Sequence, residues 1–426
     1  VIFARGDNFT YDSQTKQRLN NSKTDVPALA DPKNTLGATL LRKGGFQAVI
    51  DDLSTRKLAK IEQKAGGRKI SRVDVDGLTD ANLAGTKRSG ECTLILTEGK
   101  SAAQLALTGI AARPKGRDVY GVYPIRGKMM NLQKVDRAAR TKNKEVVDLQ
   151  KALGMRQDMV FPRDLSQLRY RHLDIMADQD PDGDHIRGLV VNAINVLHPT
   201  LARETDFLRT IITPVVRATR TGAQTRSFYD LDSAKAWQDG MAASERARWK
   251  VKYYKGLGTS TNSEAKEYFS NMGQLCKTFV FDPEATRAMT CAFGKDPDPR
   301  KAWITAADGE AFDFTKTEID LSGFVDTSVR SFFRDCLERK IPELIDGLSP
   351  TRRKIIWAAM QAGLDEEKSA EAKVMEVVGD CMKLAYHHGD ASLSGSIINM
   401  AQSFRWNLPL LEPLGQHGSR YTGGDA

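Results

Sequence analysis

Four aspartates stand at alternate positions directly after an apolar run in this chain. The run "LDIMA" leads into "DQDPDGD", which holds Asp178, Asp180, Asp182 and Asp184. Another acid, Glu98, follows a second apolar run, "TLILT". Clustered carboxylates suit Mg²⁺, which takes a few protein oxygens and completes its shell with substrate phosphate oxygens. Two such ions about 4 Å apart stabilise both oxygens of an in-line phosphoryl displacement, so the predicted substrate is a phosphodiester.

Three other interpretations compete with a magnesium site. An EF-hand loop that starts at Asp178 needs a bidentate Glu at its twelfth position, where this chain has Leu189. A P-loop at "EGKSA" needs glycine five residues before Gly99, and Leu94 stands there. A solvated acidic turn that caps the following helix is the simplest alternative. It stays open as long as the aspartates are considered alone.

The acidic residues need a scaffold that brings distant segments together. Short apolar runs at residues 93–96, 119–125 and 172–178 alternate with helical patterns, and the pattern from Ile186 to Leu197 stops before Pro199. Such alternation predicts a mostly parallel sheet, whose ligands bind beyond the carboxyl ends of the strands. We therefore expect Glu98, Lys128 and the aspartates to share one rim.

Composition limits the class of protein. Across 426 residues, 63 Lys and Arg outnumber 54 Asp and Glu, and the net charge of +9 suits a polyanionic partner, although a solvated basic surface has the same signature. The five cysteines form no C-x-x-C pair, so neither a zinc site nor a disulfide framework is predicted. No stretch approaches the roughly 18 apolar residues of a membrane helix, and we predict a soluble protein without a membrane partner.

Further motifs follow in a fixed order: "YPIRGK" at 123–128, "YYKGLGTS" at 253–260, "IPELIDGLSPTRRKIIWAAM" at 341–360, "AYHHGDASL" at 385–393 and "LGQHGSRYTGGDA" at 414–426. With the acidic motifs, they resemble the TOPRIM domain and then the winged-helix domain of type IIA DNA topoisomerases, fused as in the eukaryotic and large-virus enzymes. The resemblance implies an α/β TOPRIM domain with a Rossmann-like parallel sheet over residues 91–305. A mostly helical winged-helix domain is expected over 306–426, and a linker over 21–90. Residues 1–20 resemble the end of the ATPase region.

The resemblance also implies roles for the acids. Glu98, Asp178 and Asp180 would hold the Mg²⁺ ions, with Asp182 as an auxiliary carboxylate. Glu98 would in addition move a proton to the departing 3′ oxygen of the DNA. Asp184 is assigned to helix capping and not to metal. Two residues depart from the family pattern: Lys100, where Asp is usual, and Ser349, where Lys is commoner.

Contacts with DNA and ATP are implied in the same way. Phosphate or base contacts fall to Arg126, Lys128, Asn131, Lys255, Arg353, Lys354, Tyr386 and His388, with His388 near the scissile phosphate. Taken alone, the run of Arg and Lys at 352–354 is more typical of a solvated face, and adjacent histidines are more often structural. Gln14 and Lys16 resemble the loop that reaches the γ-phosphate of ATP, although an exposed basic turn would look the same.

Family members act as homodimers that cut one duplex and pass a second through the break, using ATP and Mg²⁺. By resemblance we expect this chain to be their DNA-cleavage core, in the nucleus of a eukaryotic cell or in the host cytoplasm or viral factory of a virus. The family's nucleophilic tyrosine follows "GGDA" in an Arg-Tyr pair, so residues 1–426 alone are expected to bind DNA without cleaving it. The alternatives are a non-cleaving DNA-binding module and a TOPRIM nuclease or primase, which leaves "GQHGSRYTGG" unexplained.

Overall fold

The structure, a computed structural model, describes residues 73–156, 159–254, 256–306, 316–365, 371–384, 386 and 389–421. Apart from the short stretch 155–159, these residues belong to one compact unit, made of residues 71–154 and 160–426. Within the described ranges, no helix combines the length and the apolar character that crossing a membrane requires.

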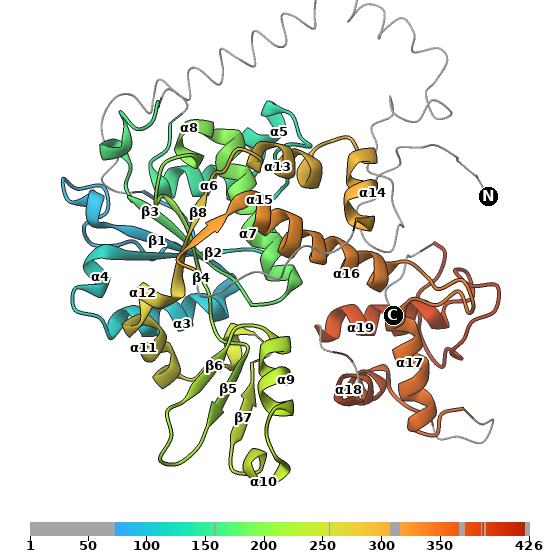
Figure 1. Cartoon of the computed structure of the whole chain (residues 1–426). Helices are drawn as coiled ribbons and strands as arrows, with labels where there is room; N and C mark the ends of the chain where they lie inside the picture. Colours follow the sequence, from blue (N-terminus) through green and yellow to red (C-terminus); the bar gives the residue numbers. More distant parts are fainter. Residues whose placement is uncertain are drawn as a thin grey trace, which may run out of the picture. The chain divides into compact units, whose positions relative to one another are not determined.

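The central element is a six-stranded sheet (Figure 1). Its strands lie in the order β2 (Tyr120–Ile125), β1 (Thr93–Glu98), β3 (His172–Met176), β4 (Leu208–Ile211), β8 (Cys276–Val280) and β9 (Glu318–Asp320). All neighbouring pairs are parallel except β4 and β8, which are antiparallel. The predicted mostly parallel sheet is therefore confirmed, and its first three strands match the three apolar runs of the sequence.

Two segments belong to this sheet region although the sequence analysis placed them elsewhere. Strand β9 lies beyond residue 305, in the range expected to be helical, yet it pairs with β8. Residues 73–90, expected to be linker, contact the other edge of the sheet through an antiparallel bridge between Thr79 and Val122. Asp80 pairs there with the fully buried Arg169. Both segments are too short and too polar to carry a strand pattern of their own.

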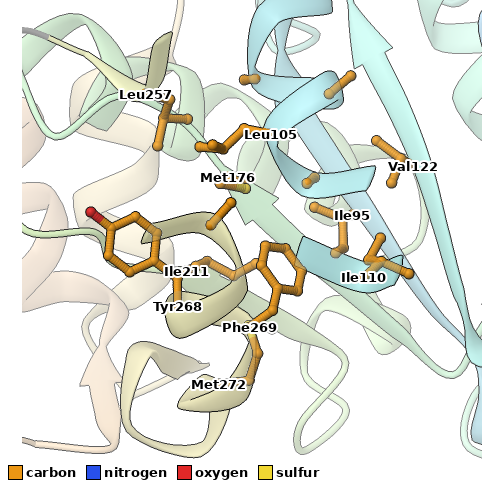
Figure 2. Packing of buried hydrophobic residues seen from close by; sticks show 14 of the residues in the cluster. Ile95, Leu105, Ile110, Val122, Met176, Ile211, Leu257, Tyr268, Phe269 and Met272 are labelled. Carbon is orange, nitrogen blue, oxygen red and sulfur yellow. The ribbon is translucent and has the colours of Figure 1, made fainter. Parts of the chain in front are cut away.

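Helices cover the sheet through apolar faces. Helix α3 (Gly99–Ala111) follows β1 directly and packs against α11 (Asn262–Ser270). Figure 2 shows their shared core, in which Ile95, Leu105, Ile110 and Phe269 lie together. The two helices approach so closely that a Cβ at Gly109 would overlap the ring of Phe269. The sequence predicts a strand-turn-helix unit after residue 93. The close packing of its helix against α11 requires glycine at position 109, which the apolar pattern does not single out.

Helix α7 (Pro181–Leu197) begins directly after the aspartates and has a nearly continuous buried face from Ile186 to Ile194. Its end before Pro199 agrees with the sequence pattern. The remaining helices of this half are short: α4 (Gly116–Val119), α5 (Arg137–Lys142), α6 (Lys144–Leu153), α8 (Pro199–Ala202) and α12 (Met272–Leu275).

A second, smaller sheet was not foreseen from the sequence. It has the order β6 (Arg226–Phe228), β5 (Val216–Thr219) and β7 (Lys250–Tyr253), and both pairs are antiparallel. Helix α9 (Leu231–Asp239) packs on it, with Val216 and Ala234 in a small core; α10 (Ala243–Arg246) precedes β7.

Helices dominate the described residues beyond 305, as predicted, and two more helices lie just before that boundary. They are α13 (Ala285–Phe293), α14 (Asp298–Thr305), α15 (Leu321–Phe324), a π-helical turn (Val325–Val329), α16 (Arg330–Lys340), α17 (Pro350–Gln361), α18 (Val374–Leu384) and α19 (Asp390–Ala401). The last three share a core of their own that includes Ile355, Cys381 and Leu393. The predicted fold class, a parallel α/β sheet followed by a mostly helical part, is confirmed.

Candidate metal and DNA-binding site

The acidic residues meet where the parallel strands end. Glu98 is the last residue of β1 and pairs in register with Ile125, the last residue of β2. Thr97 pairs with Met176, the last residue of β3, so Asp178 follows on the same edge of the sheet. Glu98 is close enough to Asp178, Asp180 and Asp182 for their charges to act on its ionisation. The structure therefore brings the four predicted ligands to one rim.

Asp180 is engaged as the cap of α7. Its Oδ1 accepts a hydrogen bond of 2.7 Å from the backbone N–H of Gly183, with Pro181 in the first helical position. A Cβ at Gly183 would overlap the carbonyl oxygen of Asp178, so the tight turn requires glycine there. The prediction that Asp184 caps this helix is wrong. Asp184 instead pairs with the buried Arg187 at 2.8 Å, and burial raises the pKa of Asp184 to about 6 against the opposing charge of Arg187.

Asp178 is held by the "YYKGLGTS" motif. Its Oδ1 accepts a hydrogen bond of 2.8 Å from the backbone N–H of Leu257, and a Cβ at Gly256 would lie 2.5 Å from its Oδ2. Burial raises the pKa of Asp178, while the bond from Leu257 opposes that shift. The glycine of this motif thus lets a loop approach the carboxylate closely, which gives the motif a structural reason beside its predicted DNA contact.

Glu98 is the least satisfied member of the cluster. Its Oε2 is buried and has no hydrogen-bond partner within the described part of the chain. Burial raises the pKa of Glu98, and the charges of Asp178, Asp180 and Asp182 raise it further. A buried oxygen without a donor, in the field of several carboxylates, fits a hard divalent cation, because such an ion relieves the repulsion.

The carboxylates do not converge as a closed ligand set. Among the described residues, no three His, Cys, Asp or Glu side chains are grouped as metal ligands. Asp180 caps α7, and Asp182 is turned to two cations. Lys128 Nζ lies 2.5 Å from Asp182 Oδ1, and Arg339 Nη1 lies 3.3 Å from Asp182 Oδ2. Glu98 and Asp178 are therefore the members best placed to receive an ion first.

Two neighbours of this cluster were missed from the sequence. Arg339 stands 157 positions after Asp182, and no motif connects the two. His185 follows the aspartates, and its ring stacks on Phe332 with centroids 3.8 Å apart, while Lys128 Nζ lies 3.3 Å from its Nδ1. Burial, and next the charge of Lys128, lower the pKa of His185 to about 3. The only sequence signal for these contacts is the aromatic pair "FF" at 332–333.

The other predicted DNA contacts of the sheet region lie nearby with partners of their own. The exposed guanidinium of Arg126 pairs with Asp76. Asn131 donates a hydrogen bond of 2.8 Å to the carbonyl oxygen of Phe293 and accepts one of 3.1 Å from Asn192, so it joins α13 to α7. A DNA contact by Asn131 remains a prediction, since its amide already serves this network.

In the helical part, Arg353 pairs with Asp346 at 2.8 Å near the start of α17, and Lys354 is exposed beside it. Tyr386 does not lie on a binding surface: it is 6% exposed and packs in the core of α17, α18 and α19. The structure gives Tyr386 a packing role in place of the predicted DNA contact.

Gln14, Lys16, Lys255 and His388 lie outside the described residues. Their predicted contacts with ATP and DNA stay predictions.

Three protein-family models match consecutive parts of the chain. The Toprim domain matches residues 93–213, the C-terminal associated domain of TOPRIM matches 211–335, and the A subunit of DNA gyrase/topoisomerase IV matches 339–426. The first match contains the whole acidic cluster. The second includes the small sheet and β9, and the third begins at Arg339, the partner of Asp182.

Curated relatives extend the match over almost the entire chain. A putative mitochondrial DNA topoisomerase 2 of Caenorhabditis elegans is 39% identical over 98% of this chain and 36% of its own length. DNA topoisomerase 2 of Arabidopsis thaliana is 40% identical over 98% of this chain and 28% of the relative. This chain belongs to the type IIA DNA topoisomerase family. It spans between 28% and 36% of the length of these relatives.

A solved structure supports the same family assignment. The DNA-binding, cleavage and re-ligation domain of Plasmodium falciparum topoisomerase II superposes with a TM-score of 0.71 at 37% identity. The match covers 83% of this chain and 48% of the Plasmodium chain. The family expected from the motifs is therefore confirmed.

Proposed function

We propose that this chain is the DNA-cleavage core of an ATP-dependent type II topoisomerase, which makes a transient double-strand break and passes a second duplex through it. The observation that carries the proposal is the carboxylate cluster at the strand ends, in which the buried Oε2 of Glu98 has no hydrogen-bond partner among the described residues. The relatives bear the name DNA topoisomerase 2, and the solved neighbour is a cleavage domain.

Glu98, Asp178 and Asp180 would hold two Mg²⁺ ions, with Asp182 as an auxiliary ligand. Bound Mg²⁺ supplies positive charge to the phosphate oxygens of the scissile bond. Glu98 itself holds a proton more readily than an ordinary glutamate, since burial and its acidic neighbours raise its pKa. Glu98 would also pass a proton to the departing 3′ oxygen, through the carboxyl oxygen that does not hold an ion.

The basic residues position the DNA. Lys128 beside the cluster, together with Arg126, Lys255, Arg353, Lys354 and His388, would contact phosphates, which supply affinity and alignment but little sequence choice. We further propose that the whole protein is a homodimer inside the cell, and that Gln14 and Lys16 contact ATP. The nuclear, viral and mitochondrial compartments are all compatible with the family.

The test uses the full-length protein that contains this chain, with supercoiled plasmid and Mg²⁺. Wild type is compared with Asp178→Asn and with Asp232→Asn, a matched control because Asp232 is an exposed acid in the first turn of another helix, α9. We expect linear DNA with protein on its 5′ ends for wild type and the control, and none for Asp178→Asn. Intact plasmid with all three proteins, but retained DNA binding, would favour a DNA-binding module that performs no chemistry.

A further inference from the structure

Asp182 differs from the other carboxylates of the rim because cations hold both of its oxygens. Lys128 lies 2.5 Å from Oδ1 and Arg339 lies 3.3 Å from Oδ2. All three side chains are partly buried, with exposed fractions between 27% and 35%. Burial alone would raise the pKa of Asp182, but the bonds and charges of Lys128 and Arg339 hold it below its ordinary value. Each oxygen of Asp182 thus has a cationic side chain as a partner.

Two aromatic side chains, Phe332 and His185, contact Lys128 and hold it beside Asp182. Its ammonium lies 4.1 Å from the ring centre of Phe332, which is 6% exposed. His185 stacks on the same ring with the two planes 10° apart. With a pKa near 3, His185 is neutral at physiological pH, so its Nδ1 can accept a hydrogen bond from the lysine 3.3 Å away. The ring of Phe332 and the neutral imidazole of His185 therefore orient the ammonium group of Lys128 towards Asp182.

Arg339 reaches Asp182 from a different element. It lies near the end of α16, and its Nε is held 2.7 Å from Asp335, one turn earlier on the same helix. Helix α16 packs against α7, whose first turn carries Asp182. The contact between Arg339 and Asp182 thus ties the end of α16 to the start of α7. The next residues along the chain lead into α17 and the helical core.

We propose that Arg339, together with Lys128, restrains Asp182 and keeps it from joining Glu98 and Asp178 around a divalent cation, so that cation affinity depends on the position of the end of α16. The inference rests on the proposed magnesium site. An Asp182 oxygen that pairs with a guanidinium has a lone pair and part of its negative charge engaged, so it is a weaker ligand for a metal ion. When Arg339 withdraws, the guanidinium no longer offsets the negative charge of Asp182, and the cation binds more tightly. Arg339 acts through Asp182 and is a positioning residue.

The test is a calorimetric titration of Mn²⁺ into the chain without DNA. The variants are Arg339→Gln, Arg339→Lys, Asp182→Asn, the double variant of Arg339→Gln with Asp182→Asn, Glu98→Gln, and Lys340→Gln as the control. Lys340 is the next residue on α16; it is exposed and makes no ion pair with Asp182 in the described structure. Thermal unfolding of each variant checks that the fold is intact. We expect Arg339→Gln to bind Mn²⁺ about two- to fivefold more tightly than wild type, in keeping with the loss of one partly exposed ion pair.

Three comparisons decide the outcome. Lys340→Gln should match wild type, and Arg339→Lys, which keeps the positive charge, should return the affinity towards the wild-type value. In the Asp182→Asn background, Arg339→Gln should change nothing, because its effect passes through that carboxylate. A gain in affinity that persists in the Asp182→Asn background, or equal affinities for wild type and Arg339→Gln, would overturn the inference.

Failure of the proposed function looks different in the same titration. If wild type binds Mn²⁺ and Glu98→Gln abolishes the binding, the metal site stands, and the Arg339 comparison judges the inference alone. If wild type binds no Mn²⁺ at all, the proposed magnesium site itself is wrong, and the inference falls with it.

Discussion

The sheet edge around Glu98 and the helical region after residue 339 hold their charged side chains in different ways. At the sheet edge, Glu98, Asp178, Asp182 and Asp184 are partly buried and Asp180 is exposed, and backbone N–H groups or cations engage the four aspartates. In the helical region, Arg353 and Asp346 pair at a surface where the two side chains are 47% and 35% exposed. Trp357 and Met360 are 52% and 48% exposed on the same helix, α17.

This difference matches two kinds of ligand. Carboxylates gathered at the ends of neighbouring strands lie within a small region, which suits a hard cation that takes oxygen ligands. Charged and apolar side chains spread over an exposed helix suit an extended partner such as a DNA backbone, where each contact contributes little. Under the proposed function, the chemistry would belong to the sheet edge, and much of the affinity for DNA would come from the helical surface.

The largest effect on activity is expected from a substitution in the carboxylate cluster at the sheet edge. In the full-length protein, Glu98→Gln keeps the shape of the side chain but removes its negative charge and its ability to exchange a proton. Plasmid cleavage with Mg²⁺ should fall by at least about 100-fold, while DNA binding by fluorescence anisotropy stays within about twofold. The control is Glu91→Gln, which removes an exposed acid that pairs with Arg88. Equal losses of cleavage and of binding would mean that Glu98 serves the fold and not the chemistry.

The core beneath that edge should be nearly as sensitive. Gly109→Ala inserts a methyl group into the ring of Phe269 at the crossing of α3 and α11. We expect the free energy of unfolding to fall by about 1–3 kcal/mol, as for other overpacked cores, in a urea titration followed by circular dichroism. An unchanged midpoint would show that α3 and α11 are not packed as closely as described.

Substitutions on the exposed surface of α17 should have a smaller effect, and they should change DNA affinity and its salt dependence, not the rate of cleavage. Removing both basic residues of α17, in Arg353→Gln with Lys354→Gln, should weaken duplex binding several-fold for every sequence tested. The slope of the salt dependence should fall by about 1 for each phosphate that is no longer neutralised. Lys235→Gln, an exposed residue of α9, is the matched control. If both proteins bound DNA as wild type does at each salt concentration, the helical surface would have no share in DNA binding.

The smallest expected effect is a gain in stability. Gly379 lies inside α18 and has open space where a Cβ would be, so Gly379→Ala meets no obstacle. Alanine loses less conformational entropy in a helix, and the free energy of unfolding should rise by about 0.5–1 kcal/mol in the same urea titration. Destabilisation would indicate a contact at this face of α18 that the described residues do not make.

The sequence located the site better than it described the contacts. Strand ends at Glu98 and Asp178 could be predicted because a parallel sheet gathers carboxyl ends on one edge, whatever the distance along the chain. Tyr386 shows the limit: a motif match placed it at DNA, but its ring lies in a core of apolar residues from three helices. The residues adjacent in the sequence do not reveal whether a side chain is buried in a core or exposed to a ligand. Strand β9 was missed because only three residues form it, and two of these are exposed.

What the sequence by itself determined is the family motifs, the parallel strands and the position of the acids at the ends of those strands. Those properties reside in residue types and short spacings. Only the tertiary structure decided which acid caps α7 and which loop holds Asp178. It also decided that Arg339 contacts Asp182, although the two residues are 157 positions apart. Such contacts depend on how separate elements pack, and packing energy comes from surfaces that meet only in the folded chain.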